Sequence, residues 1–248
     1  MPLCKDPLVS LLNGFGFNAS RIPRRDYLPG SILARKRGQA VIFFGPLVKA
    51  FELPGATSLP MTEVARADHF EGAATAGYRL GLAAKLLSPW LPLQSPITAM
   101  GFSRAKRISF RIGRIKVLTA AIADILQFMA QSEPSPALMG LNDCSLFIIS
   151  EVMQIKELSL VGGSEVESSA LLGGQEMPGI KAEVGGTGEG LIRLILNDYH
   201  TIGFKAHEIE INNGEYKLAA GRKPGGLNHM ARLDDEYNPI IFEGEPWL

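Results

Sequence analysis

Two stretches of this chain alternate between apolar and polar residues with a period of two. In Arg107–Gly113 the even-numbered residues are Ile, Phe and Ile, and the odd-numbered ones are Arg, Ser, Arg and Gly. In Tyr78–Leu86 the even-numbered positions are apolar, and the odd-numbered ones include Arg79 and Lys85. Successive side chains of a strand point to opposite faces, so both stretches predict strands with one apolar and one wet face.

Helices are predicted beside these strands. Asp6 and Pro7 start a short helix that Gly14 ends, since Asp favours the cap, Pro the first turn and Gly the end. A second helical stripe holds Leu118, Ile122, Ile125, Leu126 and Met129. Further strands are expected at Val41–Phe44, Leu146–Val161, Leu191–Leu196 and His207–Ile211, with a Gly-rich loop over 162–190. The fold class is therefore α+β, a twisted, mainly antiparallel central sheet with peripheral helices.

The charges of the chain cancel overall but are unevenly distributed. Lys and Arg number 25, and so do Asp and Glu. The stretch Gly72–Ala123 carries eight basic residues and no acidic one, whereas His229–Leu248 carries five acidic residues against Arg232 alone. A basic body with an acidic tail is typical of charge masking, although two unrelated solvated surfaces would give the same count.

Cysteine and histidine usage argues against metal and disulfide chemistry. Cys4 and Cys144 form no CxxC pair and no cluster with the four histidines. The N-terminus lacks the basic start and apolar run of a signal peptide, and no stretch approaches the ~20 apolar residues of a spanning helix. We therefore expect a soluble, cytoplasmic resting form with no metal and no cofactor.

Two motifs resemble those of gasdermins. The run Ser145–Leu160, followed by a Gly-rich insertion and the strand Gly190–Leu196, resembles a strand pair of gasdermin pore-forming domains. The segment Gly16–Arg24, with Cys4 just upstream, resembles the opening of bacterial gasdermins. The chain departs from the animal proteins because only about twenty residues follow the linker at Gly225 and Gly226, where those proteins carry a large inhibitory domain.

This resemblance implies two parts and a lipid anchor. Residues 1–224 would form the pore-forming domain, and residues 225–248 a linker with an autoinhibitory peptide. Cys4 would carry a palmitoyl group, held in an apolar groove until activation. One acyl chain is a modest anchor at ~0.8 kcal/mol per buried CH2, so it needs a basic patch beside it. Without the resemblance, an unmodified terminal thiol is the simpler interpretation.

The tail is expected to inhibit until a partner protease removes it. Its apolar contacts would be Ile240, Ile241, Phe242, Trp247 and Leu248, each worth roughly 1.5–3 kcal/mol on burial. Cleavage is expected in Ala219–Arg232, at or near Arg222, Lys223, Gly225, Gly226, Leu227, Asn228 and Arg232. The arginines would suit a basic-specific protease, and Asp234 and Asp235 an acid-specific, caspase-like one. A plain C-terminal strap would use the same residues.

After cleavage, two predicted hairpins would enter the inner membrane. The first pairs Phe70–Lys85 with Ala99–Ile115, and the second pairs Leu146–Glu167 with Glu176–Leu196. A spanning strand takes ~9–11 residues, and unpaired backbone cannot face lipid, so the hairpins would join a closed barrel of many copies. Attraction to anionic lipid would come from Arg104, Lys106, Arg107, Arg111, Arg114 and Lys116. By periodicity alone, an ordinary half-buried sheet explains the same strands.

The resemblance therefore implies a pore-forming cell-death effector of phage defence, and we expect no enzymatic activity. Nucleic-acid binding is disfavoured because only Phe110 lies among the basic residues. The alternative class is a soluble β-rich ligand-binding protein whose tail closes a pocket. A hydrolase using His200 or His207 with Asp198 or Glu208 is a weaker alternative, and Gly185–Gly190 lacks the spacing of a phosphate loop.

Overall fold

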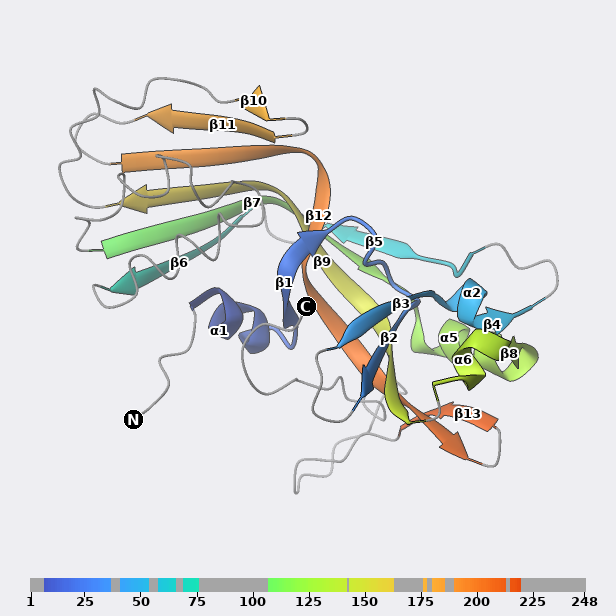
Figure 1. The fold of residues 1–248 in the computed structure, drawn as a ribbon. Helices are drawn as coiled ribbons and strands as arrows, with labels where there is room; N and C mark the ends of the chain where they lie inside the picture. The colour runs from blue at the N-terminus through green and yellow to red at the C-terminus, as the bar shows by residue number, and fades with distance from the viewer. Residues whose placement is uncertain are drawn as a thin grey trace, which may run out of the picture. The chain divides into compact units, whose positions relative to one another are not determined.

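The computed structural model describes ten stretches of the chain, and the α+β class is confirmed. These stretches are 7–36, 41–53, 58–65, 69–75, 107–141, 143–162, 176–177, 180–185, 190–212 and 215–219. Within them, eleven strands join one sheet. The strand pairs of this sheet whose register the structure describes are all antiparallel. Its main order is β10-β11-β12-β9-β2-β3; β1 and β13 also pair with β12, β7 pairs with β9, and β5 and β6 pair with β7 (Figure 1).

The strands and helices follow one another along the chain with these bounds. The helices are α1 (Pro7–Gly14), α2 (Leu47–Ala50), α5 (Ile122–Gln131) and α6 (Pro136–Met139). The strands are β1 (Asn18–Arg24), β2 (Ser31–Lys36), β3 (Ile42–Pro46), β4 (Phe51–Glu52), β5 (Thr62–Ala65), β6 (His69–Thr75), β7 (Arg107–Thr119), β8 (Glu133–Pro134), β9 (Cys144–Gly162), β10 (Glu176–Met177), β11 (Ile180–Gly185), β12 (Gly190–Asn212) and β13 (Glu215–Leu218). The pair β4–β8 forms a separate two-stranded sheet.

The chain divides into two compact units. Unit 1 consists of residues 1–11, 65–116 and 154–200, and unit 2 of residues 12–64, 117–153 and 201–248. The three long strands β7, β9 and β12 each contribute residues to both units. Of the described helices, α2, α5 and α6 belong entirely to unit 2.

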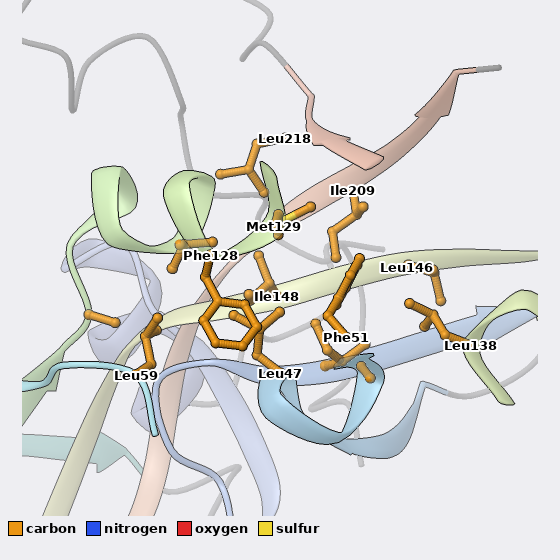
Figure 2. Packing of buried hydrophobic residues seen from close by; sticks show 14 of the residues in the cluster. Leu47, Phe51, Leu59, Phe128, Met129, Leu138, Leu146, Ile148, Ile209 and Leu218 are labelled. Carbon is orange, nitrogen blue, oxygen red and sulfur yellow. The ribbon is translucent and has the colours of Figure 1, made fainter. Parts of the chain in front are cut away.

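The larger hydrophobic cluster of unit 2 lies under helix α5. Ile125, Phe128 and Met129 are buried at the i, i+3 and i+4 spacing of one helical face. They pack with Phe51 and Ile148. Figure 2 shows Phe128 and Met129 of α5 gathered with Phe51 and Ile148 in this cluster. The cluster is completed by Ile32, Ala34, Leu47, Ala50, Leu59, Ala120, Leu138, Leu146, Ile209 and Leu218.

A second cluster covers the opposite face of the same strands in unit 2. Along β9, Leu146 and Ile148 belong to the first cluster, whereas Phe147 and Ile149 belong to the second. Tyr27 and Phe204 also lie in the second cluster, with their rings edge to face at 6.3 Å. Because successive residues of a strand face opposite sides, burial of both faces requires the continuous apolar run seen here.

Several elements differ from their sequence-based predictions. Leu118 was expected on the second helix, but it lies in β7, and the helix begins only at Ile122. The expected loop over 162–190 contains β10 and β11, and the expected strands Leu191–Leu196 and His207–Ile211 are parts of the single strand β12. The sheet explains both differences, because hydrogen bonds from neighbouring strands keep these segments extended despite their local composition.

Other elements are confirmed. Helix α1 spans Pro7–Gly14, as the Pro and Gly predicted, and β9 covers the expected strand Leu146–Val161. The expected strand Val41–Phe44 overlaps β3. The alternating stretch Tyr78–Leu86 lies outside the described residues.

Replacing Phe51 tests the core of unit 2. Its side chain is 1% exposed and meets the ring of Tyr216 edge to face at 5.2 Å. We expect Phe51→Ala to lower the free energy of unfolding by about 3–5 kcal/mol, because it removes buried area and leaves a cavity. Chemical denaturation measures the change, and Met139→Ala, at a 46% exposed side chain, should stay within about 0.5 kcal/mol of the parent. Equal losses in both variants would contradict this description of the core.

Candidate functional site

Parts of both predicted hairpins lie in unit 1, whereas residues 146–153 of the second belong to unit 2. Strand β6 pairs with β7 in an antiparallel register that runs from His69 opposite Gly113 to Thr75 opposite Arg107. Residues 76–106, which complete the first predicted hairpin, lie outside the described residues. Figure 1 shows β6, β7, β9, β12 and β11 side by side in this unit, in the order given by their pairing.

The second hairpin differs from its prediction. Its return strand was expected to be continuous over Glu176–Leu196, but that range holds β10, β11 and the first residues of β12. Strand β11 pairs antiparallel with β12, from Ile180 opposite Leu196 to Gly185 opposite Leu191. The chain direction therefore reverses between β11 and β12.

Strand β7 has one apolar and one polar face up to Gly113. Phe110 and Ile112 are 2% and 1% exposed, while Arg111 between them is exposed. Arg111 lies opposite Glu71 in the register, and its Nε is 3.4 Å from a carboxylate oxygen of Glu71. Both side chains are more than half exposed, so this pair adds little stability, about 0–1 kcal/mol. The alternation predicted from the sequence is present in the fold.

Glu157 lies on the central strand β9 and links it to the two neighbouring strands, β7 and β12. Its carboxylate accepts a hydrogen bond from Nε of Arg193 on β12 at 2.8 Å and lies 3.7 Å from Nε of Arg114 on β7. The Glu157 side chain is only 18% exposed, so these pairs are less screened than those at the surface. It lies over Gly113, where an added Cβ would contact it at 3.5 Å.

A second group of polar side chains lies on the same three strands. The ammonium groups of Lys116 on β7 and Lys156 on β9 are 4.4 and 5.8 Å from the ring centroid of Tyr199 on β12. All three residues belong to unit 1 and are partly buried. Cation–π attraction explains why two like charges share one ring.

The predicted basic residues are therefore only partly placed. Arg104 and Lys106 lie outside the described residues, and of Arg107 only the backbone is described. Arg111, Arg114 and Lys116 all belong to β7. Arg111 and Arg114 each face a carboxylate, which reduces the free positive charge of β7 in this state. The part of these residues in membrane attraction stays a prediction.

The two histidines proposed for a hydrolase are not brought together. Both lie on β12, but the Nδ1 of His200 contacts the backbone oxygen of Asp198, whereas His207 is buried. The Nε2 of His207 is hydrogen-bonded to the hydroxyl of Ser150 at 2.9 Å, and its Nδ1 has no hydrogen-bond partner in the described part of the chain. A serine protease pair needs an acidic partner at that nitrogen, so this arrangement does not resemble a catalytic triad.

Most of the other predicted sites lie outside the described residues. Cys4, the cleavage region and the apolar tail residues lie outside the described residues. Cys144 begins β9; it is partly buried, with its thiol 3.7 Å from a carboxylate oxygen of Asp143. In the described stretches, no three His, Cys, Asp or Glu side chains gather as metal ligands would. Among the helices described, none is long and apolar enough to cross a membrane.

The fold and these strands define an α+β protein whose antiparallel sheet ends in amphipathic strands. The sequence profile of the Bacterial Gasdermin Family matches residues 20–215, most of the chain, and the chain belongs to that family. The family is one of non-enzymatic, pore-forming effectors of cell death. The resemblance noted in Ser145–Leu160 and Gly190–Leu196 is thereby confirmed.

Two known proteins are similar to this chain. The chain is 24% identical to "Gasdermin bGSDM" from Vitiosangium sp. (strain GDMCC 1.1324) over 244 residues, which cover 92% of this chain and 89% of that protein. It is similar in fold to the structure of a bacterial gasdermin from Bradyrhizobium tropiciagri, with a TM-score of 0.59 and 16% identity. That match covers 87% of this chain and 91% of the other.

Burial of His207 predicts a dependence of stability on pH. Desolvation, with a smaller effect of Lys205, lowers the pKa of His207 from 6.5 to about 4. The unfolded chain therefore binds a proton between these values that the folded chain does not, so stability present above pH 6.5 is lost as the pH falls towards 4. We expect a loss of about 3 kcal/mol at its limit.

The variant His207→Gln should remove this contribution, since glutamine does not titrate but can still bond Ser150. Denaturation at pH 7.5 and pH 4.5 measures the difference between parent and variant. His200→Gln, on the exposed part of β12, serves as the matched control and should follow the parent. An identical pH dependence in parent and His207→Gln would contradict the role given to this burial.

Proposed function

We propose that this protein is a self-inhibited pore-forming effector whose activity is released when a protease removes its C-terminal tail. The observation that carries the proposal is the amphipathic sheet of unit 1 in a chain of the bacterial gasdermin family. Over residues 109–113, strand β7 has the alternation that a membrane-spanning strand requires, with one side for lipid and one for water. Family membership supports the class of activity, pore formation, and the strands of unit 1 are the part that would enter the membrane.

Insertion would use the strands of unit 1 in many copies. A spanning strand takes ~9–11 residues, and each of its backbone polar groups needs a partner inside the bilayer. Within the described part of unit 1, β6 is paired with β7 and β10 with β11 and neither has a second strand partner, so a lone copy would leave backbone groups of these strands unpaired. Several copies side by side would satisfy them, which is why we propose a homo-oligomeric pore formed with membrane lipids as its partners.

Attraction to the membrane would come from the basic residues of β7 and the segment before it. Residues 104–116 contain six basic residues and no acidic one. Each Lys or Arg near an anionic leaflet is worth ~1 kcal/mol, so several together draw the protein to the membrane. Loss of the pairs with Glu71 and Glu157 on rearrangement would free Arg111 and Arg114 for the same purpose.

The tail would hold the protein inactive through its apolar residues. Ile240, Ile241, Phe242, Trp247 and Leu248 together would supply of order ten kcal/mol at most, before ordering costs. Such a contact holds while the tail is covalently attached and is lost once it is cut, because a free peptide dilutes away. Arg222 or Arg232 would suit a basic-specific protease, and Asp234 or Asp235 a caspase-like one.

The cellular setting follows from these steps. The uncut protein would rest in the cytoplasm, and the cut one would act on the inner membrane as an antiviral, phage-defence effector that kills the host cell. A palmitoyl group on Cys4 would assist the transfer, because a single acyl chain together with a basic surface gives stable membrane binding. Nothing in this scheme needs a catalytic group of the protein's own.

Dye release from anionic vesicles tests the released activity. A protease recognition sequence is placed at Gly225 and Gly226, and leakage is measured before and after cutting. We expect leakage only after cutting, because the apolar tail contacts are lost then. The control carries the same insertion with its scissile residue changed so that the protease cannot cut it. Absence of leakage from a fully cut, folded and acylated sample would refute the proposal.

The variant Cys4→Ala tests the lipid anchor. If Cys4 is acylated, mass spectrometry of the protein from its host will show the added chain, and the variant will lack it. We expect the cut variant to release dye several-fold more slowly, because acyl burial at ~0.8 kcal/mol per CH2 no longer helps it bind. The matched control is Cys144→Ala. Full-speed leakage by an unacylated protein would contradict the part given to Cys4.

A further inference from the structure

The alternation of β7 changes phase at Arg114. Before this residue the buried positions are even-numbered, with Phe110 and Ile112 at 2% and 1% exposure. After it they are odd-numbered, with Ile115 and Val117 at 6% and 1%. Arg114 has a φ of +52°, and it is the non-glycine residue with positive φ among those that the structure describes. A left-handed residue inside a strand interrupts its regular geometry, and this interruption shifts the two sets of residues by one position.

An ion pair of the Arg114 side chain accompanies this unusual backbone. A left-handed conformation is unfavourable for residues other than Gly, Asn and Asp, so it persists only where neighbouring contacts fix it. The contact here is the ion pair with Glu157 on β9. The carboxylate of Glu157 also forms an ion pair with Arg193 on β12. The register of β6 with β7 ends one residue earlier, at His69 opposite Gly113.

In the sequence of β7, Arg114 is the first even-numbered residue that is not apolar. If the alternation of residues 108–112 continued, Arg114 and Lys116 would fall in line with Phe110 and Ile112. Two cations would then stand on the side that faces lipid. The cost of such a cation is large at the bilayer midplane and small at the interface. If the inserted strand is regular through Arg114, its lipid-facing part ends at Ile112, with Arg114 and Lys116 no deeper than the headgroups.

A separate observation marks the same level on the two neighbouring strands. Lys116, Lys156 and Tyr199 come from β7, β9 and β12, and both ammonium groups lie against the tyrosine ring. Aromatic rings with a polar end and long basic side chains are the residue types that collect at bilayer interfaces. Their meeting on three adjacent strands gives a row of side chains suited to one depth in a membrane.

We propose that Arg114, Lys116, Lys156 and Tyr199 form the headgroup-level boundary of the inserted sheet. On β7, lipid acyl chains contact residues up to Ile112, while Ile115 and Val117 stay outside the hydrocarbon. This inference rests on the proposed pore function and adds to it the place where each of the three strands leaves the bilayer. These four residues would bind the phosphate of an anionic lipid headgroup.

The sequence before Gly113 is consistent with this boundary, with Arg107–Gly113 of β7 as the last part of the span. A spanning strand of about 9–11 residues that ends at Gly113 begins between Ser103 and Ala105. Arg104 and Lys106 then fall at the other membrane surface, where basic side chains extend to the headgroups. The odd-numbered Arg111 faces water within the span. The basic stretch 104–116 is thereby divided between two interfaces and the water-facing side.

Depth-dependent quenching tests the boundary. Single cysteines replace Ile112, Arg111 and Lys116 in the full chain with the engineered cut site, in a Cys144→Ala background, and each carries an environment-sensitive dye. The parent without the added cysteine gives the signal of Cys4. After cutting on anionic vesicles, we expect acyl-chain nitroxides to quench the Ile112→Cys label and headgroup nitroxides to quench the Lys116→Cys label. Aqueous iodide should quench the Arg111→Cys label.

The outcomes separate this inference from the pore function. Vesicle leakage with the Lys116→Cys label quenched most by deep nitroxides would overturn the boundary and leave the pore function standing. Absence of leakage from the cut parent would refute the pore function and the boundary with it.

A charge reversal gives a second test that leaves the core intact. We expect Lys116→Glu to slow leakage from anionic vesicles about tenfold, since it replaces an attractive charge at the headgroups by a repulsive one. On zwitterionic vesicles the two rates should agree within about twofold, because the lipid phosphate is then no longer part of a net negative surface. Lys49→Glu, an exposed position on α2, makes the same change of net charge and should leak like the parent. Equal slowing by both variants would contradict a specific place for Lys116.

Discussion

The position of β9 between other strands is the constraint on which the described structure depends. Strands β12, β2 and β7 all hydrogen-bond to it, so its backbone is paired along most of its length. In unit 2 its residues 146–149 are buried on both faces, between two hydrophobic clusters. A strand buried on both sides has to be apolar at successive positions, and this requirement explains the run Leu-Phe-Ile-Ile at the start of β9.

The long strands change character along their length. In unit 2, β12 is buried over 201–204, whereas in unit 1 exposed residues appear at 197 and 198. Polar side chains between neighbouring strands are paired there: Lys205 with Glu151 in unit 2, and Arg193 with Glu157 in unit 1. Contacts of Glu157 with Arg193 and of Glu151 with Lys205 run in opposite directions along the two strands, which shows that β9 and β12 are antiparallel. One set of strands thus combines a doubly buried core with an amphipathic sheet.

This combination suits a protein that has to be stable before it acts. The core of unit 2 gives a fold that persists, and strand β7 of unit 1 has, over residues 109–113, the alternation suited to a second environment. Family membership gives the class of activity, and the arrangement of Arg114, Glu157, Lys116 and Tyr199 indicates where on the strands lipid would begin. The buried pair Ser150 and His207 belongs to the core, because it lies within unit 2 and lacks an acidic partner among the described residues.

The sequence by itself determined the fold class, helix α1, strand β9 and the two faces of β7, because these follow from local patterns: a capped first turn, an apolar run and a period of two. Only the tertiary structure decided that Leu118 extends a strand, that 176–196 contains a reversal, and that β12 continues through Asn197 and Asp198 to Asn212. Partners far along the chain supply the hydrogen bonds that override local preference at those points. The left-handed backbone of Arg114 was also decided only by the tertiary structure. Its ion-pair partner Glu157 lies 43 positions away in the sequence, and no local pattern predicts this contact.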